Sequence, residues 1–310
     1  MIKKDHFELT ACLLVYNHSH LISQVIQNIL AQTHSDFRLI VSDDCSTDNS
    51  FEVAKVYESL DSRVKVIKTP KNLGMAGNSN YCINSVVSTF IALLHHDDIL
   101  ERTLFEQWLK VANKSQNISF VFNEYLVNKL PNHKAEKKKF TTIMKGEKFL
   151  KNYLLSGWGS PVRGTALIRK KYFSEINGMN ENFGMLADVD LWMRLAARWD
   201  VGYVSEPLIE VRQERLENYP KDYTEFSWKR LFLLFDIHSS NINKYNYPNY
   251  FQYIFKRFIF RNKVSFEILK WHIYALYKSK SRIINDYYNH QWKYEFFYVK
   301  FIRKITQLFI

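Results

Sequence analysis

Short apolar segments alternate with amphipathic ones through the first 100 residues, and this alternation limits the possible folds more than any other feature of the chain. The apolar segments have the length of buried strands, and the segments between them carry apolar residues at helical spacing. The expected strands span residues 9–15, 37–41, 64–67 and 90–94. The expected helices span residues 19–32, 51–60 and 76–87. This order of strands and helices predicts a parallel, doubly wound α/β sheet.

Polar side chains stand where three of these expected strands end. Tyr16 and Asn17 follow the first strand, Asp43 and Asp44 end the second, and His95-His96-Asp97-Asp98 follows the fourth. A pair of aspartates by itself is common turn chemistry. In a sheet of this kind, however, ligands bind beyond the carboxyl ends of the strands, so the three groups should lie along one edge. Carboxylates gathered there repel one another unless a divalent cation or hydrogen-bond donors relieve them, and we therefore expect a ligand site.

A set of short motifs follows one another between roughly residues 8 and 215. In chain order they are Val15-Tyr16-Asn17, Ala31-Gln32-Thr33, Asp43-Asp44-Cys45-Ser46-Thr47-Asp48, Asn72-Leu73-Gly74 with a later Asn78 or Asn80, His96-Asp97-Asp98-Ile99-Leu100, and Ala187-Asp188-Val189-Asp190-Leu191-Trp192-Met193-Arg194-Leu195. Each motif is weak by itself, but the ordered set resembles glycosyltransferase family 2. The resemblance implies the GT-A fold, which is a Rossmann-like doubly wound mixed sheet. It also implies transfer of a sugar from a nucleotide donor with inversion at the anomeric carbon.

The resemblance implies that five residues bind the nucleotide: Tyr16, Asn17, Asp44, Asn72 and Asp97. In family members, the residue matched by Tyr16 stacks on the base. The one matched by Asp44 accepts a hydrogen bond from a ring nitrogen of a uracil-like base, and the one matched by Asp97 faces the ribose. The donor that the resemblance implies is therefore a UDP-sugar.

For the chemistry, the resemblance implies a metal ligand and a general base. Asp98, in the region known as DXD, would hold a divalent cation, Mg²⁺ or Mn²⁺, which suits oxygen ligands and a phosphate partner. The cation would neutralise charge on the departing nucleoside diphosphate. Asp188 would take the proton from the acceptor hydroxyl as that hydroxyl attacks the anomeric carbon.

Trp158, Asp190 and Trp192 are the candidates for binding the acceptor. Trp158 lies in a Gly-rich loop, where stacking on a sugar and local packing are both open. For Asp190 the alternative is a plain ion pair with Arg194, four residues later on the same helix. For Trp192 the alternative is a place in the core. Three arginines could contact the diphosphate, namely Arg163, Arg212 and Arg215.

The sequence departs from the family pattern at several positions. Cys45 stands where a Gly is usual, Ser79 where many members have Arg, and His95 where many have Asp. Ala187 replaces the Glu that usually precedes the base, and Glu214 stands at the place of a His that binds the metal. These changes leave the donor and the metal ligands open, but not the class of reaction.

The last 90 residues differ in composition from the rest of the chain. The net charge is +12, and residues 221–310 hold 16 Lys and Arg against 6 Asp and Glu, together with 26 of the 49 aromatic residues. We therefore expect a GT-A catalytic domain at 1–218, with a donor half at about 1–100 and an acceptor half at about 101–218. A mainly helical region is expected at 219–310.

This basic and aromatic region is typical of helices that lie on an anionic membrane surface. Residues 251–261 mix aromatic with basic side chains, and residues 294–309 carry aromatic and aliphatic residues at helical spacing with basic ones on the other side. A helical subdomain packed on the catalytic domain is the alternative. No recognised nucleic-acid module is apparent, so we expect no nucleic acid as a partner.

The sequence thus predicts an inverting, metal-dependent hexosyl- or N-acetylhexosaminyl-transferase. Its acceptor would be a growing cell-surface glycan such as a lipid-linked oligosaccharide, capsule or lipopolysaccharide. Three cysteines without metal-ligand spacing suit a reducing cytosol, so we expect a cytoplasmic protein, peripheral on the inner face of the cytoplasmic membrane. Two alternatives stay open. A sugar-phosphate nucleotidyltransferase would usually carry a Gly-rich loop after the first strand, and a catalytically inactive membrane- or RNA-binding module would not need Asp44, Asp98 and Asp188.

Overall fold

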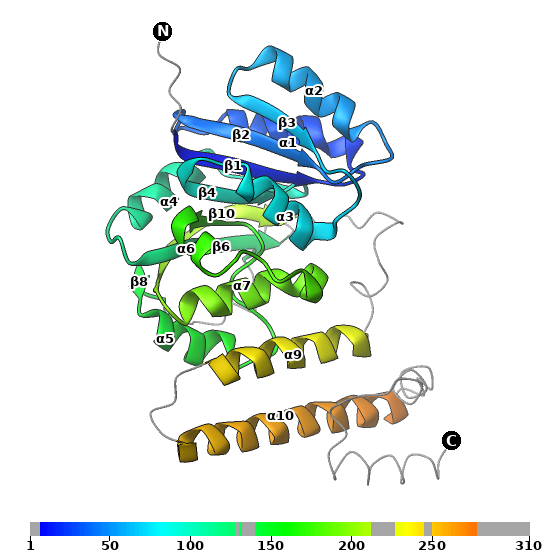
Figure 1. Ribbon diagram of the computed structural model, residues 1–310, viewed down its shortest axis with the longest axis vertical. Helices are drawn as coiled ribbons and strands as arrows, with labels where there is room; N and C mark the ends of the chain where they lie inside the picture. The colour runs from blue at the N-terminus through cyan, green and yellow to red at the C-terminus, as the bar shows by residue number, and fades with distance from the viewer. Residues whose placement is uncertain (1–6, 128–129, 132–139, 212–226, 245–249, 278–310) are drawn as a thin grey trace. The chain divides into compact units, whose positions relative to one another are not determined.

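The computed structural model describes residues 7–127, 130–131, 140–211, 227–244 and 250–277 (Figure 1). The chain divides into two compact units, Met1–Glu214 and Arg215–Ile310, and each is described here by itself. The domain boundary expected near residue 218 and the amphipathic segment at 294–309 lie outside the described residues.

The first unit is built on one mixed sheet, in which ten strands are described. The strands are β1 (Phe7–Val15), β2 (Phe37–Asp43), β3 (Val64–Lys68), β4 (Ser88–His95), β5 (Asp98–Leu100), β6 (Ile118–Val127), β7 (Leu130–Pro131), β8 (Ile143–Met144), β9 (Ala166–Arg169) and β10 (Asp200–Val211). Their order across the sheet is β3-β2-β1-β4-β9-β6-β10-β5, with β7 beside β6 and β8 beside β10.

Helices connect these strands. They are α1 (Ser19–Leu30), α2 (Ser50–Leu60), α3 (Gly74–Asn84), α4 (Leu104–Ala112), α5 (Gly146–Phe149), α6 (Lys170–Glu175) and α7 (Ala187–Ala196), with a short π-helical segment at Leu150–Leu154 and a 3₁₀ segment at Glu181–Leu186. The strand–helix alternation predicted for the first 100 residues is confirmed, and the boundaries agree to within a few residues.

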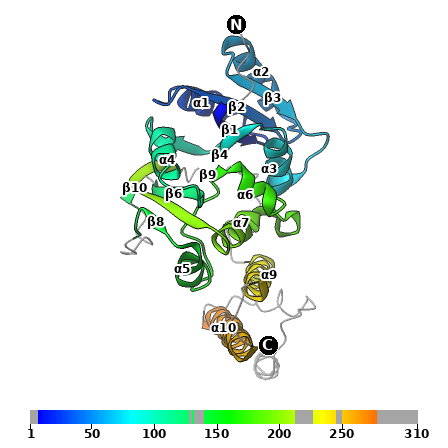
Figure 2. The same ribbon diagram turned by 60° about the vertical axis from the view of Figure 1, so that its left-hand side comes forward.

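The order in which strands are added to the sheet reverses between the third and fourth strands, although all four strands are parallel. β1, β2 and β3 step outward in one direction, and β4 then returns to pair with the other side of β1, all in parallel. Because crossovers between parallel strands are right-handed, α1 and α2 lie on one face of the sheet and α3 on the other (Figure 2). The carboxyl ends of β1 and β4 therefore form the switch point where sheets of this type bind ligands.

The second half makes the sheet mixed. β9 runs antiparallel to both β4 and β6, whereas β6 and β10 are parallel. This mixed order agrees with the GT-A sheet that the resemblance implied. All four residues of β9 are buried, and the order places the segment just before β9 next to the end of β4.

The core follows from the sequence pattern. Residues 9–15 of β1 are buried, as their continuous apolar run predicts for a central strand. Helix α1 buries Ile22, Val25, Ile26 and Ile29 on one stripe. At about 25 cal/mol per Å² of apolar surface, this burial is the main stabilising contribution to the fold.

The second unit contains two described helices, α9 (Trp228–Lys244) and α10 (Tyr250–Tyr277). They pack against each other, and the ring of Trp228 lies 5.4 Å from that of His272. Along α10 the buried face includes Phe260, Val264 and Ile268. Neither described helix of this unit is apolar enough over its length to cross a bilayer, and the same holds for every helix the structure describes.

Candidate active site

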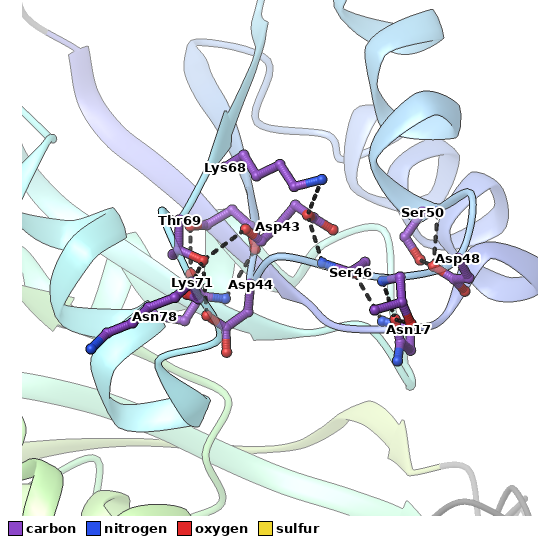
Figure 3. Close-up of polar contacts among 12 residues, drawn as sticks. Asn17, Asp43, Asp44, Ser46, Asp48, Ser50, Lys68, Thr69, Lys71 and Asn78 are labelled. Atoms are coloured by element: carbon purple, nitrogen blue, oxygen red, sulfur yellow. Dashed lines mark hydrogen bonds and ion pairs between the residues drawn. The ribbon is translucent and has the colours of Figure 1, made fainter.

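The loops that follow β1 and β2 are joined by hydrogen bonds at the switch point (Figure 3). The backbone N–H of Asn17 donates to Ser46 Oγ at 3.0 Å, and Asn17 Oδ1 accepts from the backbone N–H of Thr47 at 2.8 Å. Asn17 has a φ of +54°, in the left-handed region that Asn tolerates better than most residues. The Asn17 side chain therefore orders the edge, while the neighbouring Tyr16 is 41% exposed there.

Asp44 ties this edge to the start of α3. Its Oδ1 accepts hydrogen bonds from the backbone N–H of Leu73 at 2.8 Å and from Thr69 Oγ1 at 3.0 Å, and its Oδ2 accepts from the N–H of Gly74 at 2.8 Å. The positive end of the helix dipole favours a carboxylate at this place. Asn72 adds a bond from the Gly74 N–H to its own Oδ1 at 3.1 Å. Each carboxylate oxygen can accept two bonds, so Asp44 Oδ2 keeps one acceptor position for a ligand.

The neighbouring Asp43 also ends β2, and it bonds to the loop that follows this strand. It is 1% exposed, and its Oδ2 accepts from the backbone N–H of Ser46 at 3.0 Å. Lys68 Nζ lies 3.9 Å from the same oxygen. Between Asp44 and Ser46, Cys45 has a φ of +58°, a conformation that favours glycine. The Gly that family members usually carry here suits the turn better than the Cys of this chain.

Two histidine rings, one after β1 and one after β4, contact each other with their planes tilted by 41°. The rings of His18 and His96 have centroids 3.6 Å apart, and Nδ1 of His96 lies 3.1 Å from the carbonyl oxygen of Leu14. Burial, followed by the charge of His18, lowers the pKa of His96 to about 4. His96 is therefore neutral at physiological pH, with its proton on Nδ1. Its Nε2 is buried and has no hydrogen-bond partner.

Asp98 is the most deeply buried carboxylate at the end of β4. It is 1% exposed, and its Oδ2 accepts a 2.5 Å hydrogen bond from Thr165 Oγ1. Its Oδ1 has no hydrogen-bond partner, and the nearest cation is Arg163, whose guanidinium lies 3.9 Å away. Burial raises the pKa of Asp98, and the charge of the partly exposed Asp97 raises it further.

Asp188 lies in the first turn of α7. Its Oδ1 accepts from the backbone N–H of Val189 at 2.8 Å. Burial raises the pKa of Asp188, and the charges of His95 and Arg163 lower it in part. The same two residues act in the same direction on the pKa of Asp98. The expected metal ligand and the expected base, 90 positions apart in the sequence, thus have common electrostatic neighbours.

The three residues considered for binding the acceptor differ in how exposed they are. Trp192 has no exposed surface and packs on Phe120 with ring centroids 4.9 Å apart, so it belongs to the core. Asp190 is 1% exposed and forms the predicted ion pair with Arg194, at 2.6 Å. Their burial favours the two alternatives, an ion pair for Asp190 and a core position for Trp192, over contact with an acceptor. Trp158 is partly exposed in its loop.

One carboxylate oxygen at the edge, Asp98 Oδ1, suits a divalent cation of the kind the resemblance implies. Buried polar atoms without a hydrogen-bond partner gather here, namely His95 Nε2, His96 Nε2, Asp98 Oδ1 and Arg163 Nε. No cluster of three His, Cys, Asp or Glu side chains occurs among the described residues. An unpaired oxygen of Asp98 suits a hard cation that takes its other ligands from phosphate and water. Arg212, Glu214 and Arg215 lie outside the described residues.

Three residues of this site carry no local sequence signal for it. Thr165 and Gly164 precede the short strand β9, and His18 follows Asn17 as an ordinary helix-start residue. Pairing of β9 with β4 brings Thr165 and Gly164 to the edge, whereas His18 lies in the loop that directly follows β1.

The chain matches the family model described as Glycosyl transferase family 2 over residues 10–176. A protein of Methanocaldococcus jannaschii described as an uncharacterized glycosyltransferase is 29% identical over 205 residues, which are 64% of this chain and 68% of that protein. The Escherichia coli enzyme WfgD, described as a UDP-Glc:alpha-D-GlcNAc-diphosphoundecaprenol beta-1,3-glucosyltransferase, is 35% identical over 121 residues, 39% of this chain and 47% of that enzyme.

Among solved structures, that of S. aureus TarS in complex with UDP-GlcNAc is similar, with a TM-score of 0.58 at 13% identity. The likeness covers 77% of this chain and 68% of that one. At this level of identity the likeness shows a common fold.

Proposed function

The chain belongs to glycosyl transferase family 2, and from that premise we propose that it is an inverting, metal-dependent glycosyltransferase that uses a UDP-sugar. The sugar it transfers is of the hexosyl or N-acetylhexosaminyl type, and the acceptor is a hydroxyl of a growing, lipid-linked surface glycan. One observation carries the proposal. Beside the switch point, Asp98 and Asp188 both have raised pKa values, and His95 and Arg163 act electrostatically on both carboxylates. WfgD, by its description, acts on a sugar linked to diphosphoundecaprenol, and TarS has been solved with UDP-GlcNAc.

The donor nucleotide lies along the ends of β1, β2 and β4. The exposed ring of Tyr16 stacks on the base, and the remaining acceptor position of Asp44 Oδ2 receives the ring N–H of a uracil. Asn17 joins the loop after β1 to the loop after β2, and Asn72 orders the start of α3, each by accepting from a backbone N–H. Asp97, partly exposed between the base and the diphosphate, faces the ribose.

The sugar is transferred in one displacement. The acceptor oxygen forms a bond to the anomeric carbon while the bond from that carbon to the diphosphate oxygen breaks, and the hydroxyl proton passes to Asp188. The raised pKa of Asp188 makes it a stronger base than an exposed aspartate, as general-base catalysis near neutral pH requires. No covalent intermediate forms, so the configuration at the anomeric carbon inverts.

Asp98 would hold the divalent cation, because its Oδ1 has no hydrogen-bond partner, and Thr165 fixes the carboxylate by its bond to Oδ2. When bound, the cation acts as a Lewis acid that stabilises the charge of the leaving diphosphate. Burial of Asp98 strengthens its attraction for a cation, because less water screens the carboxylate charge.

A lipid-linked acceptor places the reaction near a membrane, and α10 supports peripheral binding at the inner face of the cytoplasmic membrane. Six large apolar side chains of α10 are exposed within about 100° of the helix circumference, opposite the face that packs on α9. They are Phe255, Phe258, Ile259, Phe266, Ile273 and Tyr277. Lys256, Lys263 and Lys270 follow one side of this stripe, two helical turns apart; Lys270 is exposed, and Lys256 and Lys263 are partly buried. Aromatic residues that insert beside lysines are typical of helices that lie in an anionic interface.

Release of nucleoside diphosphate tests the reaction. The full chain is incubated with Mg²⁺ or Mn²⁺, a panel of UDP- and GDP-sugars and a lipid-diphosphate-linked sugar acceptor. We expect acceptor-dependent release from a UDP-sugar, with the opposite anomeric configuration in the product by NMR. Pyrophosphate release from a nucleoside triphosphate and a sugar phosphate would instead indicate a nucleotidyltransferase. Membrane binding without any turnover would indicate an inactive module.

A further inference from the structure

Three consecutive residues before β9 contact the end of β4. Thr165 Oγ1 donates to Asp98 Oδ2 at 2.5 Å, and the Arg163 guanidinium lies 3.9 Å from Asp98 Oδ1. Between them, Gly164 lies so close to His95 that a Cβ at position 164 would be 2.3 Å from His95 Nε2. The segment 163–165 is therefore fitted to this strand end and forms a wall of the reaction site.

Arg163 differs from the structural arginines of the same unit. Arg169 is 3% exposed and donates to the carbonyl oxygens of Ile118, Ala112 and Ser115 at 2.9–3.2 Å. Arg194 uses all three of its nitrogens, on Asp190 and on two backbone carbonyls.

The side chain of Arg163 is 36% exposed, and its buried Nε has no hydrogen-bond partner. Its contact with Asp98 is too long for a hydrogen bond. The guanidinium packs over Tyr125, 5.2 Å from the ring centroid. The charge of Arg163 favours ionisation of both Asp98 and Asp188. An arginine held in this way faces the reaction site with donors to spare.

We propose that Arg163 binds the diphosphate of the nucleotide donor, and that it neutralises Asp98 only while the divalent cation is absent. The proposal rests on the function proposed above and assigns a second cationic group to the leaving diphosphate.

The reason is competition for one oxygen. Asp98 Oδ1 is the oxygen nearest to Arg163 and also the unpaired oxygen available to a divalent cation. Two cations on one carboxylate oxygen repel each other, and the divalent one is attracted about twice as strongly at equal distance. With a cation on Oδ1, the guanidinium would be free to bind the diphosphate, whose oxygens match its planar set of donors.

Thr165 makes this exchange compatible with a fixed Asp98. Its bond to Oδ2 holds the carboxylate whether or not Arg163 is paired with Oδ1. Thr165 thus positions Asp98, so Arg163 is not needed for that role and can bind the diphosphate.

The test compares Arg163→Met with the wild type by calorimetry, using UDP, UMP and uridine in the presence of Mn²⁺. We expect UDP affinity to fall roughly 10- to 100-fold, as for the loss of charge-assisted hydrogen bonds, with little change for UMP or uridine. Arg163→Lys keeps the charge without the planar fork and should fall between the two. Arg198→Met removes an exposed arginine that packs over Trp199, and it serves as the matched control with unchanged affinities.

A second measurement follows Mn²⁺ alone by electron paramagnetic resonance. Removing a competitor for Asp98 should leave Mn²⁺ binding unchanged or make it tighter in Arg163→Met. A parallel loss of Mn²⁺, UMP and UDP binding would mean that Arg163 only supports the fold of the site, and would overturn the proposal. Equal UDP affinity in wild type and variant would overturn it as well. A wild-type protein that binds no nucleoside diphosphate with Mn²⁺ would instead contradict the proposed function itself.

Discussion

Thr165 and Asp98 are joined by a 2.5 Å hydrogen bond across 67 positions of the sequence. The bond fixes one oxygen of a buried carboxylate and leaves the other, Oδ1, without a hydrogen-bond partner. A carboxylate in that state is costly to keep ionised in the free protein, and a bound cation relieves the cost.

Asp98→Asn should abolish transfer while the protein stays folded. The neutral amide can still accept the Thr165 hydroxyl, but it binds a divalent cation poorly. A loss of about 4 kcal/mol of leaving-group stabilisation corresponds to roughly a 10³-fold lower kcat. Turnover is measured with and without EDTA, and folding by thermal denaturation. Near-wild-type turnover in the variant, insensitive to the chelator, would show that Asp98 is not the metal ligand.

Asp188→Asn should remove the base without touching the donor. We expect kcat to fall roughly 10²- to 10⁴-fold, the usual range for a general base, with the affinity for UDP unchanged. Stopped assays of transfer and calorimetry of UDP binding separate the two effects. A variant with weaker UDP binding and normal turnover at saturation would place Asp188 on the donor side.

The pH dependence should report the raised pKa of Asp188. Because the ionised form is the base, kcat/KM should rise with pH, and its acidic limb should lie above the range of an ordinary aspartate. Since Arg163 lowers this pKa, Arg163→Met should move the limb to higher pH.

The raised pKa of Asp188 also affects stability. Because the pKa of Asp188 in the folded protein exceeds its pKa in the unfolded chain, the stability contributed by protonated Asp188 is lost as pH rises from the unfolded pKa through the folded pKa. Melting temperatures of wild type and Asp188→Asn across that range provide the check, and the variant should lack this component of the slope.

Asp44→Ala should weaken both the fold of the edge and nucleotide binding. It leaves the N–H groups of Leu73 and Gly74 without their carboxylate partner at the start of α3. The expected cost is about 1–3 kcal/mol of unfolding free energy, measured by urea denaturation. The affinity of the Asp44→Ala variant for UMP should fall as well. Glu52→Ala, an exposed change in α2, is the control and should alter neither quantity.

The exposed stripe of α10 should bind anionic vesicles. We expect co-sedimentation with phosphatidylglycerol vesicles that weakens in high salt, because each lysine near the surface contributes roughly 1 kcal/mol. The double change Phe255→Glu and Phe258→Glu should reduce binding strongly, and deletion from about residue 290 should reduce it too. Leu60→Glu, at a 73% exposed site in α2, is the matched control. Equal binding to neutral and anionic vesicles would contradict the membrane assignment. A dimer in solution that buries the exposed stripe of α10 would contradict it as well.

The parallel half of the sheet follows from the sequence because its signals are local. The apolar run of β1, the helical stripe of α1 and the polar residues after each strand are visible within short windows, and a parallel sheet brings strand ends to one edge. The ordered motifs add the family and, with it, the mixed second half. The glycine expected after Asp44 also has a local reason, since Cys45 occupies a left-handed position in the turn.

Tertiary structure decided which polar groups are satisfied and which face a ligand. β9 has four residues, and nothing in so short a segment predicts that it pairs with both β4 and β6. That pairing brings Thr165 and Arg163 to Asp98. In the same way Trp192 and Asp190 belong to a promising motif, yet the packing of α7 buries both. Burial and hydrogen-bond partners depend on contacts between segments far apart in the chain. The local residue pattern does not indicate which distant segment will pack against a given residue.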